Sequence, residues 1–137
     1  MNTFALILTG ILGAICTFYI NNTLKQGAVR ASAGLSLVIA VLFYIFPNVF
    51  SPYLTRHIPV VFIGATFIGM VSSDVLGHYL LLSLAGALFA ILYIHSSNFF
   101  NGYGGALGTT ASITVLVAIS LAMVSKHKYI RRLRKRK

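Results

Sequence analysis

The fold is decided by residues 75–94, VLGHYLLLSLAGALFAILYI, a run of 20 residues without Asp, Glu, Lys or Arg. A helix of about 20 predominantly apolar residues matches the hydrocarbon thickness of a bilayer. Backbone polar groups find no water inside a bilayer, so such a run crosses it as a helix. The run also lacks the period-2 alternation of a barrel strand. This stretch therefore predicts a transmembrane helix.

Four further apolar runs lie on either side of it, at about 3–20, 31–46, 58–71 and 104–124. The first and last are long enough to span in the same way. The other two are short and need flanking residues or a locally thinner bilayer, and run 58–71 has a re-entrant half-helix as its alternative. The prediction is an all-α membrane bundle of five transmembrane helices, with four spans as the alternative.

Composition agrees with a membrane protein. The chain is 58% hydrophobic and 9% charged, whereas soluble domains carry about 25% charged residues. Of the 11 Lys and Arg residues, eight lie in the last 12 positions. A charge-poor body with a basic end is not typical of a nucleic-acid-binding domain, so no nucleic acid is expected as a partner. We divide the chain into a transmembrane bundle, residues 1–125, and a basic tail, residues 126–137.

Polar residues and prolines fill the expected connections, among them 21–30 and 47–57. Pro59 is expected in the first turn of the third helix, where a missing N–H costs nothing. Residues 72–74, Ser-Ser-Asp, are expected to form a short link that caps the fourth helix.

Charge placement predicts the orientation. Five spans put Lys25, Arg30 and the tail on one side of the membrane and Arg56 alone on the other. Because Lys and Arg favour the cytoplasmic side, the N-terminus is predicted outside and the C-terminus in the cytoplasm. The expected location is a cell inner or plasma membrane. A four-span chain would instead have both ends inside.

The stretch 101–112, NGYGGALGTTAS, concentrates glycines and hydroxyls at the start of the fifth helix. Small residues four apart let helices pack closely. A broken helix start would instead expose backbone groups that coordinate an ion or substrate. The candidate transport-path or packing residues are Gly104, Gly105, Gly108, Thr109, Thr110 and Ser112.

Small residues four apart recur in three other helices. They predict a compact bundle without a large internal cavity, so a sizeable apolar substrate would bind between subunits or at the lipid face. The pairs are Gly10/Ala14, Ala65/Gly69, Ser83/Ala87 and Gly86/Ala90.

Asp74 is the only acidic residue of the chain. Its place before the predicted fourth helix favours capping and a favourable interaction with the helix dipole. His78 follows four residues later, so a titrating Asp74–His78 pair is the functional alternative. His57 and His95 are interpreted as polar anchors at the outer interface. No metal site or other cofactor is expected.

The basic tail is interpreted as a topology determinant that also contacts anionic lipid head groups, at about 1 kcal/mol per cation near the surface. Its contact candidates are Lys126, Lys128, Arg131, Arg132, Arg134, Lys135, Arg136 and Lys137.

Residues 9–18, TGILGAICTF, resemble the Gly-Gly-x-x-Gly-Ala-x-x-Arg-Tyr pattern of the small fluoride-channel family. That family consists of short, four-span, dimeric proteins, and 104–112 distantly resembles its Gly- and Thr-rich helix break. Here Thr17 stands where the pattern has arginine, and run 31–46 lacks the family's asparagine. The predicted fifth span also departs from the family, so the chain is not assigned to it.

Catalysis is not expected. The sequence has no Gly-x-Ser-x-Gly elbow, His-Glu-x-x-His or P-loop, and a single acidic residue cannot supply a carboxylate pair. Two function classes remain. The glycines and threonines at the start of the fifth helix favour an ion or small-solute channel or transporter that acts as a homo-oligomer. The scarcity of polar groups in mid-helix favours a non-catalytic accessory subunit of a larger membrane protein complex.

Overall fold

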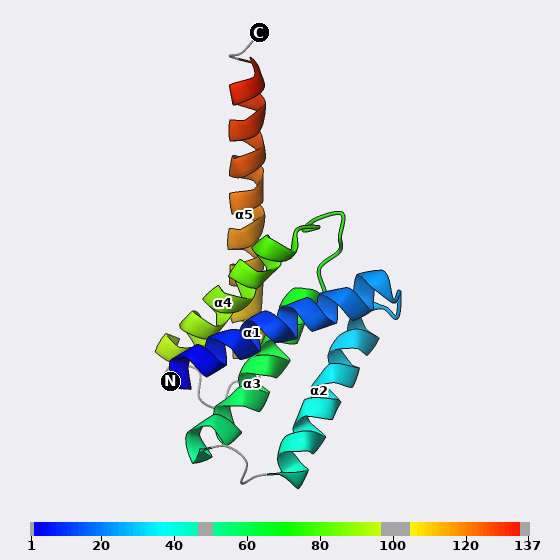
Figure 1. Cartoon of the computed structure of the whole chain (residues 1–137), viewed down its shortest axis with the longest axis vertical. Coiled ribbons are helices and arrows are strands. Elements are labelled where there is room, and N and C mark those ends of the chain that lie inside the picture. The colour runs from blue at the N-terminus through cyan, green and yellow to red at the C-terminus, as the bar shows by residue number, and fades with distance from the viewer. Residues whose placement is uncertain (1, 47–50, 97–104, 135–137) are drawn as a thin grey trace.

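The computed structural model describes residues 2–46, 51–96 and 105–134, with the backbone alone for 125–134. Five α-helices, one π-helical turn and no strand occur within these ranges, which confirms the all-α prediction. In chain order the elements are α1 (Asn2–Phe18), the π-helical turn η1 (Tyr19–Thr23), α2 (Ala28–Ile45), α3 (Pro52–Gly69), α4 (Tyr79–Ser96) and α5 (Ala106–Arg134) (Figure 1).

Helix α3 begins six residues before the apolar run that predicted it. Ser51 caps its first turn, since its Oγ accepts a hydrogen bond from the Leu54 N–H at 3.4 Å. Pro52 follows at a position where no N–H is needed. Pro59 therefore lies inside α3 and not in its first turn, which corrects the expectation from the sequence. The sequence did not indicate this early start, because the polar residues Arg56 and His57 precede the apolar run.

Helix α4 begins later than predicted, at Tyr79, and the connection before it runs from residue 70 to 78. The expected short link at 72–74 is therefore wrong. The N–H groups of Val75 and Leu76 both bond to the Ser72 carbonyl at 3.0 Å, which closes a turn instead of a helix. Leu76 is only 1% exposed, so burial of this side chain holds the connection against the bundle.

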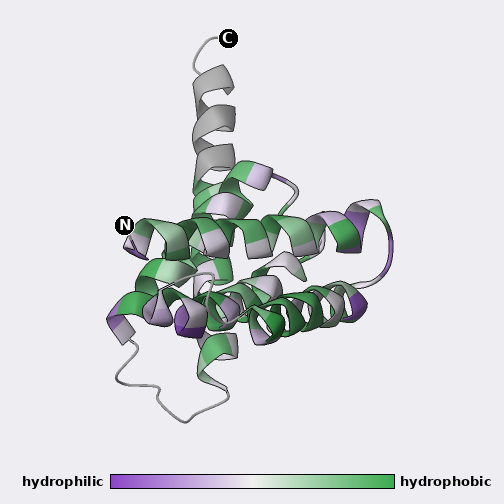
Figure 2. Ribbon diagram, turned by 60° about the horizontal axis from the view of Figure 1, so that its bottom comes forward, coloured by the Kyte–Doolittle hydropathy of each residue, from purple (hydrophilic) through white to green (hydrophobic). Residues whose placement is uncertain are grey.

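Four helices are long and apolar enough to cross a membrane: α1 continued through η1, α2, α4, and α5 over Ala106–Val124. Figure 2 shows their mostly hydrophobic colouring. Helix α3 equals α2 in length at 18 residues, but Arg56 and His57 in its first two turns lower its hydropathy.

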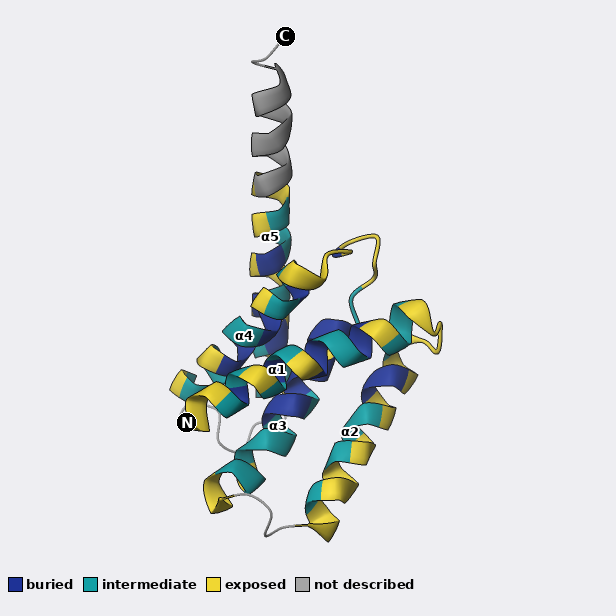
Figure 3. Ribbon diagram, viewed as in Figure 1, coloured by how far each residue is buried: buried dark blue, intermediate teal, exposed yellow. Residues whose placement is uncertain are grey.

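Helix α3 occupies the centre of the bundle, because α1, α2, α4 and α5 all pack against it. Its buried residues lie in the second half, from Val61 to Gly69. In α2, by contrast, only Ala31 and Ser32 are buried. Figure 3 shows this gradient, with buried residues gathered where α1, α3 and α4 meet and exposed residues along α2.

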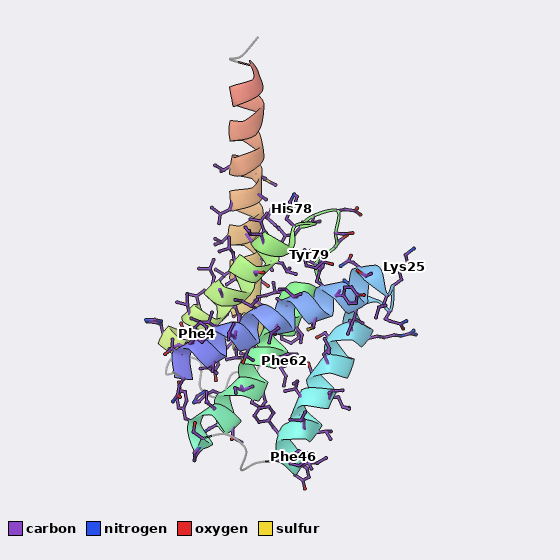
Figure 4. The ribbon with its side chains drawn as sticks, in the orientation of Figure 1. Phe4, Lys25, Phe46, Phe62, His78 and Tyr79 are labelled. Atoms are coloured by element: carbon purple, nitrogen blue, oxygen red, sulfur yellow. The ribbon has the colours of Figure 1, made fainter. Side chains whose placement is uncertain are left out.

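Side-chain contacts show which helix ends lie together. Phe18, at the end of α1, makes an edge contact with Tyr79 at the start of α4, with ring centroids 5.5 Å apart. Lys25 projects away from the bundle beyond η1, and His78 and Tyr79 mark the start of α4 (Figure 4). At the other end of α4, Tyr93 hydrogen-bonds to His57, which lies near the start of α3. Helices α1 and α3 therefore run antiparallel to α4.

Glycines bring the core helices into backbone contact. A Cβ on Gly86 of α4 would lie 2.6 Å from the carbonyl oxygen of Gly10 in α1. A Cβ on Gly69 of α3 would lie 2.5 Å from the carbonyl oxygen of Ala14, and one on Gly64 would overlap the Phe89 ring. The predicted packing role of Gly10/Ala14, Ala65/Gly69 and Gly86/Ala90 is thus confirmed. Ser83 and Ala87 are only partly buried.

These contacts predict that Gly86→Ala destabilises the bundle by about 1–3 kcal/mol, because the added methyl group meets backbone that cannot move aside. Gly34→Ala is the matched control, since a Cβ there has nothing within 4 Å. It should leave stability unchanged or raise it by up to about 1 kcal/mol, through higher helix propensity. Thermal unfolding of both variants in detergent measures the difference. Equal midpoints for the two variants would contradict the close contact.

Candidate functional site

The start of α5 is a regular helix in the part of the chain that the structure describes, from Gly105 onward. The Thr109 N–H bonds to the Gly105 carbonyl at 3.0 Å. The Thr109 and Thr110 hydroxyls both donate to the Ala106 carbonyl, at 3.0 and 2.8 Å, and the Ser112 hydroxyl donates to the Gly108 carbonyl at 2.9 Å. These hydroxyls therefore satisfy themselves on their own helix. Gly104 lies outside the described residues.

Most of the described candidate residues of α5 lie on the side away from the bundle, whereas Thr110 is half-buried beside the inward-facing Ala111. Helix α5 packs inward through Ala111, Thr114 and Ala118, each at most 2% exposed. On the other side Thr109 and Ser112 are exposed, and a Cβ on Gly105 or Gly108 would have nothing within 4 Å. We call Gly105, Gly108, Thr109 and Ser112 the outer face of α5. Among the residues that the structure describes, no neighbouring helix comes within 4 Å of a Cβ at either glycine of this face.

Asp74 is exposed in the connection before α4, five residues ahead of the helix start. Its Oδ2 accepts a long hydrogen bond of 3.5 Å from the Ser72 hydroxyl, and its N–H donates to Ser72 Oγ at 3.3 Å. His78 directly precedes α4, and its carbonyl accepts from the N–H of Leu82 at 3.1 Å. The segment between Asp74 and His78 is not helical, so the helical i, i+4 spacing that suggested their pairing does not apply. Their pairing stays a prediction.

Two adjacent asparagines in η1 bind the end of α3. The Asn21 amide donates to the Met70 carbonyl, and the Asn22 amide donates to the Val71 carbonyl, both at 3.3 Å. Asn22 Oδ1 also accepts from the Ser73 N–H at 3.1 Å. Carbonyl groups at a helix C-terminus lack hydrogen-bond donors within the helix, and these side-chain amides serve as the donors. Sequence reasoning missed this clamp, although an Asn pair directly after an apolar run was visible.

A second cluster joins the opposite ends of α3 and α4. His57 Nδ1 lies 2.9 Å from the Tyr93 hydroxyl, and the Tyr53 ring covers the imidazole with centroids 4.3 Å apart. His57 directly precedes the apolar run 58–71 and is adjacent to Arg56 in the sequence. We call Tyr53, His57 and Tyr93 the His57 cluster. His95 makes a separate bond from Nδ1 to the Ile91 carbonyl oxygen, at 2.9 Å.

The contact between α2 and α3 includes a buried pair of hydroxyls. Thr66 donates to the Ile63 carbonyl at 2.7 Å, and its Oγ1 lies 2.7 Å from Ser32 Oγ. A hydroxyl has one proton, so Ser32 donates to Thr66. This is a specific polar contact in an otherwise apolar interface, and spacing in the sequence could not reveal it.

The tail residues from Lys126 to Arg134 lie on the backbone of α5, which continues beyond its apolar part. Lys135, Arg136 and Lys137 lie outside the described residues. The predicted lipid contacts therefore stay predictions.

No family model, curated protein or solved structure matches this chain.

The asparagine clamp predicts that Asn22→Ala loosens the connection between α3 and α4, at a cost of about 1–3 kcal/mol, because carbonyl and N–H groups lose their partners. The control is Gln26→Ala, which removes an exposed amide with a single 3.4 Å bond to Leu24. Hydrogen exchange of residues 70–78 should rise in the first variant and stay unchanged in the second. Unchanged exchange in Asn22→Ala would contradict the clamp.

Proposed function

We propose that this chain is a small multi-pass membrane protein that acts as a homo-oligomer and conducts or transports an ion or small solute. The outer face of α5 forms the contact between copies and lines the path. The observation that carries the proposal is that exposed hydroxyls lie beside glycines that no described helix of this chain covers. Small residues let a second helix approach, and hydroxyls offer oxygen atoms to a passing solute.

The closed core supports a path between copies over a path through one. Gly10, Gly64 and Gly69 hold the core helices in contact. The four buried polar side chains of the described residues are all Ser or Thr: Thr17, Ser32, Thr66 and Thr114. Thr17 and Thr114 bond to carbonyls of their own helices at 2.8 Å. These four side chains are at most 4% exposed, so a solute outside the bundle does not reach their oxygen atoms.

The proposal includes five spans, with α3 as a central span shielded by its neighbours. Its support is that η1 and the connection 70–78 lie together, bonded through Asn21 and Asn22. The exposed cations Lys25 and Arg30 would then share the cytoplasmic side with the tail. The tail contacts anionic head groups of an inner or plasma membrane. No catalytic step is proposed, because Asp74 is the only acidic residue.

The alternative function is a non-catalytic accessory subunit of a larger membrane protein complex. The apolar, closely packed core favours this alternative, because such a core stabilises the bundle and offers no reactive groups. In this case the outer face of α5 binds a helix of the larger protein, and the chain alone carries no flux.

The five-span proposal predicts opposite labelling of two serine positions. With Cys16, the only cysteine, replaced by alanine, Ser51→Cys and Ser73→Cys are introduced singly. A membrane-impermeant maleimide applied to intact cells should label position 51 and not position 73, because α3 separates them. Permeabilised cells control for reactivity. Labelling of both positions from the same side would contradict a spanning α3.

The outer face of α5 predicts that Gly108→Leu reduces self-association and flux together, because the larger side chain keeps a second helix away. Ala40→Leu is the matched control, since Ala40 is an exposed small residue of α2. The mass of the detergent-extracted chain and the flux of reconstituted liposomes are measured for both. Self-association that survives Gly108→Leu would contradict the proposed contact. If Gly108→Leu abolishes association but the unsubstituted chain also carries no flux, the result would favour the accessory subunit.

A further inference from the structure

The His57 cluster is independent of the outer face of α5 and has no part in the proposed path. Its hydrogen bond joins α3 to α4, which also approach each other where the Phe89 ring lies against Gly64. The Tyr93 ring also meets the imidazole edge-on, with centroids 5.9 Å apart. The imidazole is thus held between two tyrosines from two helices, at the end of α3 opposite the asparagine clamp.

The charges around His57 are one-sided. On its own helix it is adjacent to Arg56, and among the described residues the Tyr53 ring and the Tyr93 hydroxyl contact it. The only acidic side chain of the whole chain, Asp74, lies beyond the opposite end of α3. No side-chain carboxylate can therefore approach the imidazole from within the chain. A protonated His57 would place a second positive charge beside Arg56 without a counter-ion.

We propose that the His57–Tyr93 hydrogen bond is a pH-sensitive contact that holds α3 and α4 together at the end of α3 opposite the asparagine clamp. Neutral His57 fits the cluster, because the Tyr53 ring packs against it, Nδ1 meets the Tyr93 hydroxyl and no second positive charge is placed beside Arg56. Protonation adds an unpaired cation next to Arg56. The start of α3 and the end of α4 then separate, which exposes the charged imidazole to water.

The direction of the pH effect follows from which form the fold prefers. The folded state holds neutral His57, whereas the unfolded chain binds a proton near the ordinary histidine value of about 6.5. Stability from this cluster is therefore complete above about pH 6.5 and is lost as the pH falls below it.

The experiment compares thermal unfolding of the full chain in lipid nanodiscs at about pH 7.5 and pH 5.5, values that bracket histidine titration. Wild type should lose thermal stability at the lower pH. His57→Gln should lose much less, because glutamine still bonds to Tyr93 and does not titrate. His95→Gln is the matched control on the same end of α4 and should fall as wild type does. An equal fall in His57→Gln and wild type would overturn the proposal.

Hydrogen exchange distinguishes a separation of the helix ends from a general loss of stability. At the lower pH, exchange should rise selectively in residues 52–58 and 90–96 of wild type, after correction for the intrinsic effect of pH on exchange. Tyr93→Phe should show that rise already at the higher pH, because the hydroxyl partner is absent. A uniform change along all helices, or none in these two segments, would also overturn the proposal.

Discussion

Backbone contact between α1 and α4 at Gly10 and Gly86 is the constraint on which the rest of the structure depends. Each glycine leaves room for the other's carbonyl oxygen, and no larger residue fits at this separation. Gly69 of α3 approaches α1 in the same way at Ala14. A helical glycine costs about 1 kcal/mol relative to alanine, which dispersion contacts along the closely packed helices offset. These contacts place α3 in the centre, even though its first two turns are polar.

Because helix backbones pack closely in the core, the polar clusters described above lie at the ends and on the surface of the bundle. The asparagine clamp occupies one end of α3 and the His57 cluster the other. The outer face of α5 carries hydroxyls and glycines away from the core. Function is therefore proposed at surfaces where this chain meets a second copy, lipid or the aqueous phase.

The sequence predicted the helical class and most of the close packing, because apolar length and small residues four apart are local signals. It placed the starts of α3 and α4 wrongly, since the Ser51 cap and the burial of Leu76 outweigh the apolar pattern. It also missed the partners of Asn22 and His57. Those partners lie 49–51 and 36 residues away along the chain, and only the packing of α3 against its neighbours brings them together.

If the core of this chain is closed and the chain acts through contacts with copies of itself, the native complex is a homo-oligomer. The most direct test is the mass and composition of the complex after mild detergent extraction from its native membrane. A homo-oligomer would contain a single kind of chain, and its mass would be a whole multiple of the mass of that chain after subtraction of bound detergent and lipid. A monomer, or a fixed stoichiometry with a larger protein, would contradict it. The larger protein would in that case define the function.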